Sequence, residues 1–293
     1  MTFKKYFGDK NFYKTVMSVA VPIMIQNFIT NFVSMLDNLM VGSLGTEQMS
    51  GVSIVNQLIF VFNLAVFGAL SGAGIFTAQF FGKNDPDGIR YTIRYKVIVT
   101  LLLFGVAIFI FNVFEEPLIN MFLHESDANA DVALTLEFAK KYLKTILWGI
   151  FPFCVAQIFS STLRETGETV APMVAGFIAV LTNCLFNWVL IFGKLGFPQL
   201  GVQGAAIATN ISRYVECAVI IVFVILKRKK FSYFKGVFRS FGIPKKVFKD
   251  ITVKGMPYCL TSFSGLWECH FSVLRTVYTV LTLLQVTVFL QLL

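Results

Sequence analysis

Residues 15–41 read TVMSVAVPIMIQNFITNFVSMLDNLMV, an apolar stretch of 27 residues in which Asp37 carries the only charge. A helix needs about 20 predominantly apolar residues to cross the hydrocarbon core of a bilayer. The stretch therefore predicts a transmembrane helix. The acidic residue inside it needs a polar partner or a wet cavity, because hydrocarbon solvates a carboxylate poorly.

Similar apolar runs follow at roughly 49–81, 97–114, 139–163, 171–193 and 203–226, and a seventh run extends over 255–293. Hydrophobic residues make up 56% of the 293 residues, charged residues make up 14%, and the mean hydropathy is +0.72. Soluble domains carry about 25% charged residues, so this composition excludes a cytosolic enzyme, a disordered chain and a nucleic-acid-binding module. We predict an all-α, polytopic integral membrane protein with a six-helix transmembrane lobe and a partial seventh helix.

Charge is distributed unevenly between the connections of these spans. Segment 227–254 has ten basic residues and one acidic residue, and segment 82–96 has four basic and two acidic residues. Segment 115–137 has six acidic residues and no Lys or Arg. Because basic connections stay in the cytoplasm, we expect a plasma (inner) membrane protein with a cytoplasmic N-terminus. The strongly basic segment is expected to contact membrane lipid, and no nucleic-acid partner is expected.

The basic segment also separates two similar stretches of sequence. Residues 14–22 and residues 249–257 each run from a basic residue through an apolar turn to a proline that enters a new span. Repeats of this kind are common in transporters. We therefore divide the chain into a six-helix lobe (1–226), a basic cytoplasmic linker between lobes (227–254) and the incomplete start of a second lobe (255–293).

Polar residues within the first span share one stripe of the helix. At about 100° per residue, Gln26, Thr30 and Asp37 lie on the same side, which predicts a wet cavity along it. Burying a carboxylate at a helix centre costs roughly 2.5–3.5 kcal/mol, so Asp37 is a candidate functional residue. The alternative is a neutral Asp37 that forms a hydrogen bond with a neighbouring helix.

The fifth and sixth spans offer oxygen ligands at a similar depth to Asp37. Asn183 and Asn187 are four residues apart and share a face, and Thr209 lies about 12 Å inside the start of the sixth span. A carboxylate with amide and hydroxyl oxygens suits a hard monovalent cation or a proton. We predict a cation site of Asp37, Asn183, Asn187 and Thr209, with Na⁺ or H⁺ as the coupling ion and no other metal or cofactor. Ordinary hydrogen bonding between helices remains the alternative.

The second span carries two more polar candidates. Asn56 and Asn63 are seven apart on one face, and with Gln26 and Thr30 they are assigned to a substrate cavity. Small residues such as Gly72, Gly74 and Gly204 indicate close helix packing. Arg213 and Glu216 are expected to pair within their helix. No arrangement of nucleophile and base indicates an enzyme.

Five short motifs follow one another along residues 15–226. They are DNLMVG at 37–42, followed by Leu44 and Gly45; the Gly- and Gln-containing end of the second span at 72–82; LRETGET at 163–169, followed by Pro172; the asparagines and LIFG at 183–193; and GVQGAAIAT at 201–209. In this order they resemble the multidrug and toxic compound extrusion (MATE) family of cation-coupled efflux antiporters. The resemblance implies two six-helix lobes around a central cavity that opens alternately to each side. It also implies a cation site in the first lobe and export of cationic, apolar small molecules. Family members often have a second carboxylate where this chain has Asn187.

The resemblance ends near Pro257, and we hypothesise a frameshift near residues 258–264; a divergent seventh helix is the alternative. The sequence thus predicts an incomplete half of a multidrug efflux antiporter. We expect little transport by the chain alone unless a second half-transporter lobe pairs with it. A lipid-linked precursor flippase of related fold, and an inactive membrane remnant or interaction subunit, are the other hypotheses.

Overall fold

The computed structural model describes residues 10–123, 131–229, 231–237 and 242–255. The expectations for the tail after Gly255, including the frameshift and the partial seventh helix, lie outside these residues. The long elements are α1 (Lys10–Gly42), α2 (Thr46–Gly82), α3 (Pro86–Val113), α6 (Ile150–Glu165), α7 (Val170–Phe192) and α8 (Gly201–Leu226). The shorter elements are α4 (Glu115–Leu123), α5 (Val132–Ile146) and the 3₁₀ turns η2 (Leu147–Gly149) and η3 (Ser232–Phe234).

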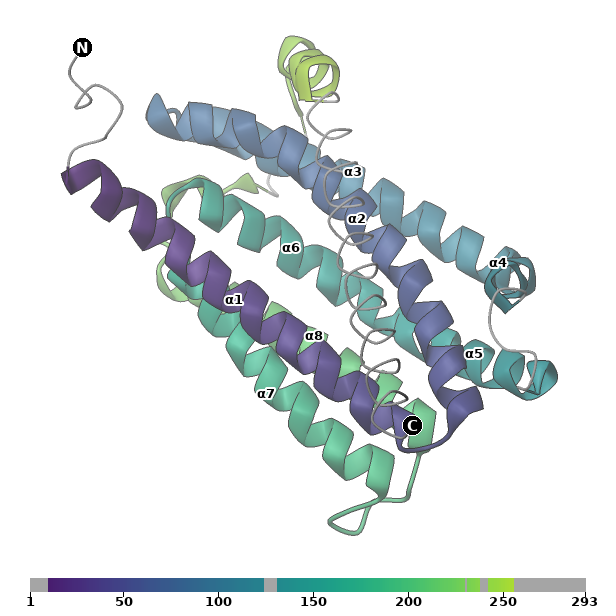
Figure 1. The fold of residues 1–293 in the computed structure, drawn as a ribbon. Coiled ribbons are helices and arrows are strands. Elements are labelled where there is room, and N and C mark those ends of the chain that lie inside the picture. Colours follow the sequence, from purple (N-terminus) through teal and green to yellow (C-terminus); the bar gives the residue numbers. More distant parts are fainter. Residues whose placement is uncertain (1–9, 124–130, 230, 238–241, 256–293) are drawn as a thin grey trace, which may run out of the picture.

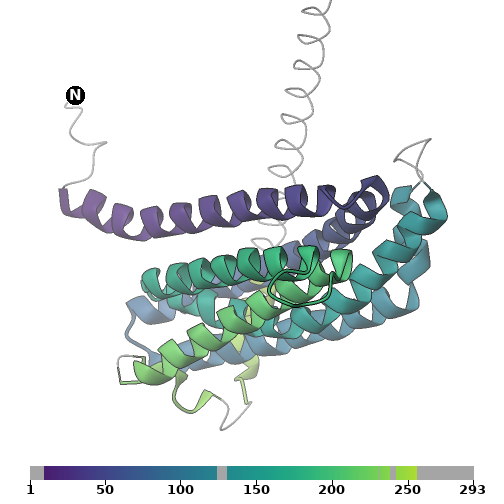
Figure 2. The same cartoon turned by 90° about the horizontal axis from the view of Figure 1, so that it is seen from below.

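The long helices run side by side in one tilted bundle (Figure 1). Helix α6 passes through the middle, where it contacts α2 and α3 on one side and α7 and α8 on the other. Helix α1 lies along α7 as an outer layer (Figure 2). Helices α5 and α6, joined by η2, form one continuous rod of 34 residues.

The described helices are built for a lipid environment. Five of them are long and apolar enough to cross a bilayer, namely α2, α3, the α5–α6 rod, α7 and α8. Helix α1 adds another long helix of 33 residues. Large apolar side chains are exposed around the bundle, such as Phe28, Leu102 and Leu185, as expected for a surface that faces lipid tails. The predicted all-α polytopic membrane fold is confirmed.

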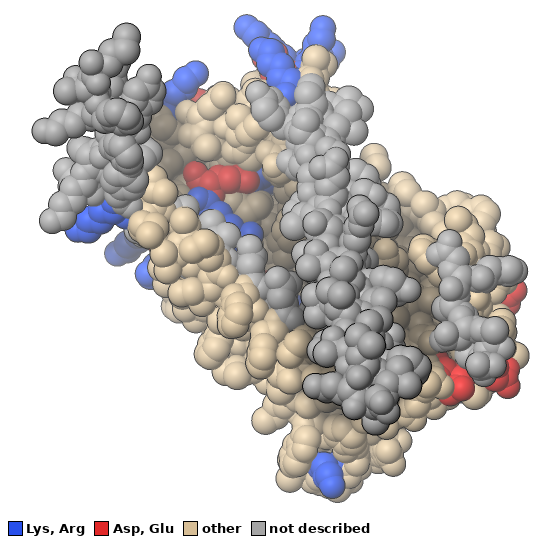
Figure 3. Space-filling model, in the orientation of Figure 1, with Lys and Arg blue, Asp and Glu red and all other residues tan. Residues whose placement is uncertain are grey.

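Charged side chains occupy opposite ends of the bundle. In Figure 3, basic side chains gather mainly toward the end where α1 begins, acidic ones lie near α4 and α5, and a smaller acidic patch lies on the α1 side of the same face. We call the first the linker end, because the described linker residues 227–229, 231–237 and 242–255 lie there, and the second the acidic end. Most of the described atoms that are visible between the two ends are uncharged, as for a membrane-embedded band.

The start of α3 differs from the sequence prediction, because the expected connection 82–96 shortens to residues 83–85. Asp85 caps the helix, and its side chain accepts hydrogen bonds from the backbone of Asp87 and Gly88, while Pro86 occupies the first turn. This is a strong start signal for a helix. Basic residues that were counted as loop charges therefore lie inside α3.

One of these basic residues is buried in the bundle. The side chain of Lys96 has no exposed surface and forms an ion pair with Glu165 at the end of α6. Its ammonium also donates to Ser161 Oγ at 3.2 Å and to Thr162 Oγ1 at 3.3 Å. Gly74 leaves the space for Glu165, since an added Cβ would lie 2.3 Å from its Oε1. A buried charge is tolerated when it is paired and hydrogen-bonded in this way.

Helices α7 and α8 approach closely at Gly204. A Cβ on this residue would lie 2.7 Å from the carbonyl oxygen of Leu190. Ala205, Ala206 and Ala208 are buried beside it. The predicted packing role of these small residues is confirmed, and the contact fixes α7 against α8.

We expect Gly204→Ala to lower the free energy of unfolding by about 1–3 kcal/mol, because the new methyl group meets rigid backbone. Thermal unfolding in detergent micelles measures this change. Gly105→Ala is the matched control, since a Cβ there meets nothing within 4 Å. Equal losses in the two variants would contradict the packing role.

The basic linker is attached to the lobe through Arg94 of α3. Its Nε donates to the carbonyl of Val237 at 2.9 Å, and Nη1 donates to that of Gly242 at 2.8 Å. Tyr233 is buried and its hydroxyl lies 2.8 Å from Thr166 Oγ1. Burial raises the pKa of Tyr233 to about 12, so this phenol stays neutral at physiological pH.

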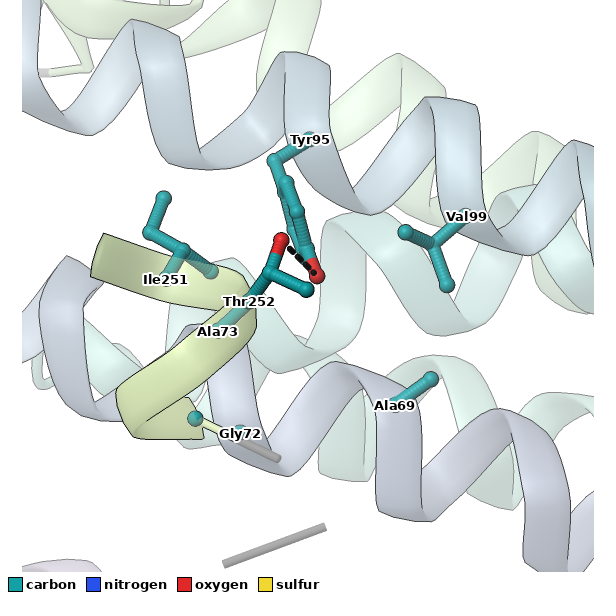
Figure 4. Close-up of a pocket in the computed structure, with 8 residues that line it drawn as sticks. Ala69, Gly72, Ala73, Tyr95, Val99, Ile251 and Thr252 are labelled. Atoms are coloured by element: carbon teal, nitrogen blue, oxygen red, sulfur yellow. Dashed lines mark hydrogen bonds between the residues drawn. The ribbon is translucent and has the colours of Figure 1, made fainter. Parts of the chain in front are cut away.

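Residues 245–255 then form a helical segment that returns to α2 and α3. The hydroxyl of Tyr95 lies 3.3 Å from Thr252 Oγ1, and a Cβ on Gly72 would lie 2.7 Å from the carbonyl oxygen of Gly255. Figure 4 shows these groups around a small apolar pocket of about 160 Å³. The end of the linker is thus packed against the lobe.

Arg94→Gln should release the linker, because an amide side chain cannot serve the carbonyls of Val237 and Gly242 together. We expect trypsin to cleave the native protein after Lys229 or Lys235 about tenfold faster or more, as followed by mass spectrometry. Arg90→Gln serves as the control, since Arg90 contacts the linker through a 3.4 Å hydrogen bond to the Ser232 carbonyl and otherwise pairs with Asp87 of its own helix. Unchanged cleavage in Arg94→Gln would show that other contacts hold the linker.

Candidate functional site

Asp37 lies on α1, five residues before the helix ends at Gly42 near the acidic end. Its side chain is part-buried and faces α7. The amide of Asn187 donates to Asp37 Oδ1 at 2.5 Å. Asn187 itself is 1% exposed. The carboxylate is therefore held by a buried amide from a neighbouring helix.

Asn183 and Thr209 complete the cluster around the carboxylate. The Nδ2 of Asn187 also donates to Asn183 Oδ1 at 3.1 Å, and the Nδ2 of Asn183 donates to Thr209 Oγ1 at 3.3 Å. Thr209 in turn donates to the Ala205 carbonyl at 3.0 Å. Helices α1, α7 and α8 thus bring together all four residues of the predicted cation site.

The orientation of the Asn183 amide decides whether the Asp37 carboxylate faces a donor or an acceptor. One end of the Asn183 amide lies 2.8 and 3.1 Å from the two Asp37 oxygens. If its nitrogen lies there, the amide donates to the carboxylate; if its oxygen lies there, a proton or a cation must separate the two acceptors. The Oδ1 of Asn187 is also buried without a hydrogen-bond partner in the described structure. An unpartnered amide oxygen close to a carboxylate fits a bound cation or proton.

A cavity of about 450 Å³ opens beside the cluster, and Asp37, Asn187 and Thr209 contribute to its wall. This volume lies within the range of small-molecule sites. The predicted cavity residues Asn56 and Asn63 of α2 also line it. The polar face of α2 thus lines this cavity, and the assignment of Asn56 and Asn63 to a substrate site stays a prediction.

Gln26 does not line this cavity. The structure therefore does not place it in one cavity with Asn56 and Asn63, as the sequence had predicted. Its Oε1 accepts a hydrogen bond from Arg164 at 3.0 Å. Gln26 and Asp37 share a stripe of α1 but are 11 residues apart, which separates them by about 16 Å along the axis. The side chain of Thr30 lies outside the described residues.

Tyr142 and Arg213 are among the residues of the cavity wall that were not assigned to it from the sequence. Tyr142 of α5 donates to Asn56 Oδ1 at 3.3 Å, and Arg213 of α8 lies one helical turn beyond Thr209. Arg213 is four residues after Thr209 and so shares its helix face, and this spacing could have predicted that Arg213 lies near the cavity. Its expected partner Glu216 forms no close ion pair with it among the described residues, although the two opposite charges interact electrostatically.

The MatE family model matches residues 22–189, which is more than half of the chain. The chain belongs to the MATE family. Its match includes Asp37 and both asparagines of the cluster, whereas Thr209 lies beyond it. MATE proteins are transporters, so this chain is not an enzyme.

Curated relatives carry multidrug-resistance names. The "Probable multidrug resistance protein NorM" of Thermotoga maritima is 31% identical over 253 residues, which cover 85% of this chain and 52% of the relative. The protein of that name in Bacillus subtilis is 27% identical, with 83% of this chain and 52% of the relative covered. The chain thus spans about half the length of these MATE relatives.

Solved MATE structures share the fold. A crystal structure of MATE in complex with MaD3S has a TM-score of 0.72 and 23% identity, and covers 86% of this chain and 54% of its own. An outward-facing multidrug resistance MATE family transporter has a TM-score of 0.70 and 24% identity, with 86% and 53% covered. The described bundle therefore has the architecture of part of a MATE transporter.

Asn187→Leu tests whether Asn187 holds the carboxylate. We expect the free energy of unfolding to fall by about 1–3 kcal/mol, because Asp37 loses a buried donor. Thermal unfolding in detergent measures the loss. Asn112→Leu is the control, since that exposed amide bonds to the Ile108 carbonyl of its own helix. A wild-type unfolding temperature for Asn187→Leu would contradict the assignment.

Proposed function

We propose that this chain forms one lobe of a cation-coupled multidrug efflux antiporter. MATE membership and the multidrug-resistance names of its relatives support drug export. The observation that carries cation coupling is the buried grouping of the Asp37 carboxylate with Asn183, Asn187 and Thr209, in which the Oδ1 of Asn187 has no hydrogen-bond partner in the described structure. A proton or a sodium ion supplies the missing positive charge.

The Asn183 amide offers a physical basis for coupling. When Asp37 is charged and has no bound cation, the amide nitrogen faces the carboxylate and donates to it. When a proton or Na⁺ is bound, the amide oxygen faces the site and the nitrogen bonds to Thr209, at 3.3 Å. Because Asp37, Asn183 and Thr209 belong to α1, α7 and α8, occupancy changes the contacts between three helices. Antiport requires such differential affinity for the two states of a transporter.

The same geometry suggests which class of small molecules is exported and how the lobe is completed to a transporter. A cavity of about 450 Å³ with Asp37 in its wall favours small apolar molecules that carry a cationic group. We place the protein in the plasma (inner) membrane with a cytoplasmic N-terminus, so that the linker end faces anionic lipid. A second lobe, joined after the linker or supplied by a partner, completes the alternating-access unit.

Asp37→Asn should remove the cation dependence of stability. For the chain in lipid nanodiscs, we expect the unfolding temperature of the wild type to rise with Na⁺ concentration or with falling pH, because the bound cation stabilises the folded form. Separate titrations of Na⁺ at fixed pH, and of pH without Na⁺, identify the ion.

Asp87→Asn is the matched control, since Asp87 is exposed on the first turn of α3 and its side chain is 66% accessible. It should respond to the ions like the wild type. An equal ion response in Asp37→Asn and the wild type would exclude Asp37 as the coupling group.

A further inference from the structure

The last described part of the linker, residues 245–255, is a helical segment with two unlike faces. Ile251 is 1% exposed and Gly255 is also buried, and both face the lobe. Phe248 packs on Tyr95 of α3, with 5.3 Å between the ring centroids. The outer side of the segment carries exposed lysines. A helix with one apolar and one basic face is typical of segments that lie in the membrane interface.

The segment lies where the bundle leaves the hydrocarbon core. In Figure 1 it is drawn in yellow-green and seen nearly end-on, whereas the long helices run across the picture, so it crosses α2 and α3. Its contact on α2 is Gly72, ten residues or about 15 Å before that helix ends at Gly82. Helix α2 has 37 residues and is about 55 Å long, so about 12 Å extends past a 30 Å core at each end when it is centred. The segment is therefore near the level of the lipid headgroups.

An apolar pocket of about 160 Å³ lies between this segment and the two helices (Figure 4). Residues with little or no side chain, Ala69, Gly72 and Gly255, form part of its wall and leave it unfilled. The hydroxyl groups of Tyr95 and Thr252 in the wall form a hydrogen bond with each other, at 3.3 Å. An apolar cavity of this size stays free of water but admits a benzene-sized group. A stretch of lipid acyl chain fits it.

One stripe of the segment connects this pocket with two lysines. Lys245, Lys249 and Thr252 are four and three residues apart, so they share one side of the helix. Thr252 lines the pocket, and both lysines are exposed. Neither lysine forms an ion pair with a described residue, whereas Lys254 pairs with Asp250 at 3.2 Å. Two ammonium groups thus lie along the pocket side of the segment and can receive an anion.

We propose that α2, α3 and residues 245–255 together bind one anionic phospholipid. The first methylene groups of one acyl chain occupy the apolar pocket, and the phosphate lies between Lys245 and Lys249, which donate to its oxygens. The lipid fills the contact between the linker and the lobe and neutralises both lysines, so it stabilises the docked linker. This adds a defined site to the contact with anionic lipid expected of a basic linker, and it does not depend on ion coupling or drug export.

Native mass spectrometry of the full chain in detergent tests the headgroup site. The probes are phosphatidylglycerol and phosphatidylcholine with identical acyl chains. We expect the wild type to bind phosphatidylglycerol about tenfold more tightly. The double variant Lys245→Gln/Lys249→Gln should lose this preference. Lys246→Gln/Lys254→Gln is the matched control, since it removes the same charge from the same segment but off the stripe, and it should keep most of the preference.

Ala69→Leu tests the pocket separately. The larger side chain fills part of the space that the acyl chain would occupy. We therefore expect both lipids to bind about fivefold more weakly, with the preference for phosphatidylglycerol retained. A wild-type affinity for both lipids in this variant would overturn the assignment of the acyl chain to the pocket.

Two other results would overturn the headgroup site. One is equal affinity of the wild type for the two lipids. The other is an equal loss of preference in the two lysine double variants, which would indicate a diffuse basic surface instead of a site. The wild-type comparison decides the question even if the variants misfold. None of these results bears on cation coupling, because Asp37 lies toward the acidic end of the lobe.

Discussion

A carboxylate inside a bilayer-spanning bundle needs hydrogen-bond partners from other helices. This constraint determines how α1, α7 and α8 pack around Asp37. Asp37 meets an amide of α7 at 2.5 Å, and that amide is linked through Asn183 to Thr209 of α8. The match requires α7 and α8 to be in close contact, which Gly204 permits. Packing of small residues and polar pairing are therefore parts of one arrangement.

The spans and the grouping of Asp37 with polar residues of α7 and α8 could be predicted from the sequence because both depend on local quantities. An apolar run of sufficient length defines a span, and helical rise converts sequence position into depth within it. Asp37, Asn183, Asn187 and Thr209 were expected at one level, and the structure brings them together. Gln26 shows the limit of this kind of prediction. Helical periodicity assigns a residue to a helix face, but it does not show which side chains share a cavity.

Other features depended on partners distant in sequence. Lys96 was counted as a loop charge because Glu165, 69 residues later, could not be recognised as its counter-ion. Arg94 likewise bonds to a carbonyl 143 residues away. Arg213 was given a partner on its own helix, although three-dimensional packing directs it to the cavity of Asp37. A single sequence reports spacing along one helix but not which helices become neighbours.

The buried pair of Lys96 and Glu165 also constrains biosynthesis. Lys96 lies about 15 Å from the start of α3, and its counter-ion belongs to a helix that the ribosome completes much later. A lone ammonium at the centre of a membrane helix opposes insertion by roughly 2.5–3.5 kcal/mol, and Lys96 has no ion-pair partner until Glu165 has been synthesised. The buried position of Lys96 is therefore stabilised only once α6 has packed against α3, which makes this contact a late one in the assembly of the bundle.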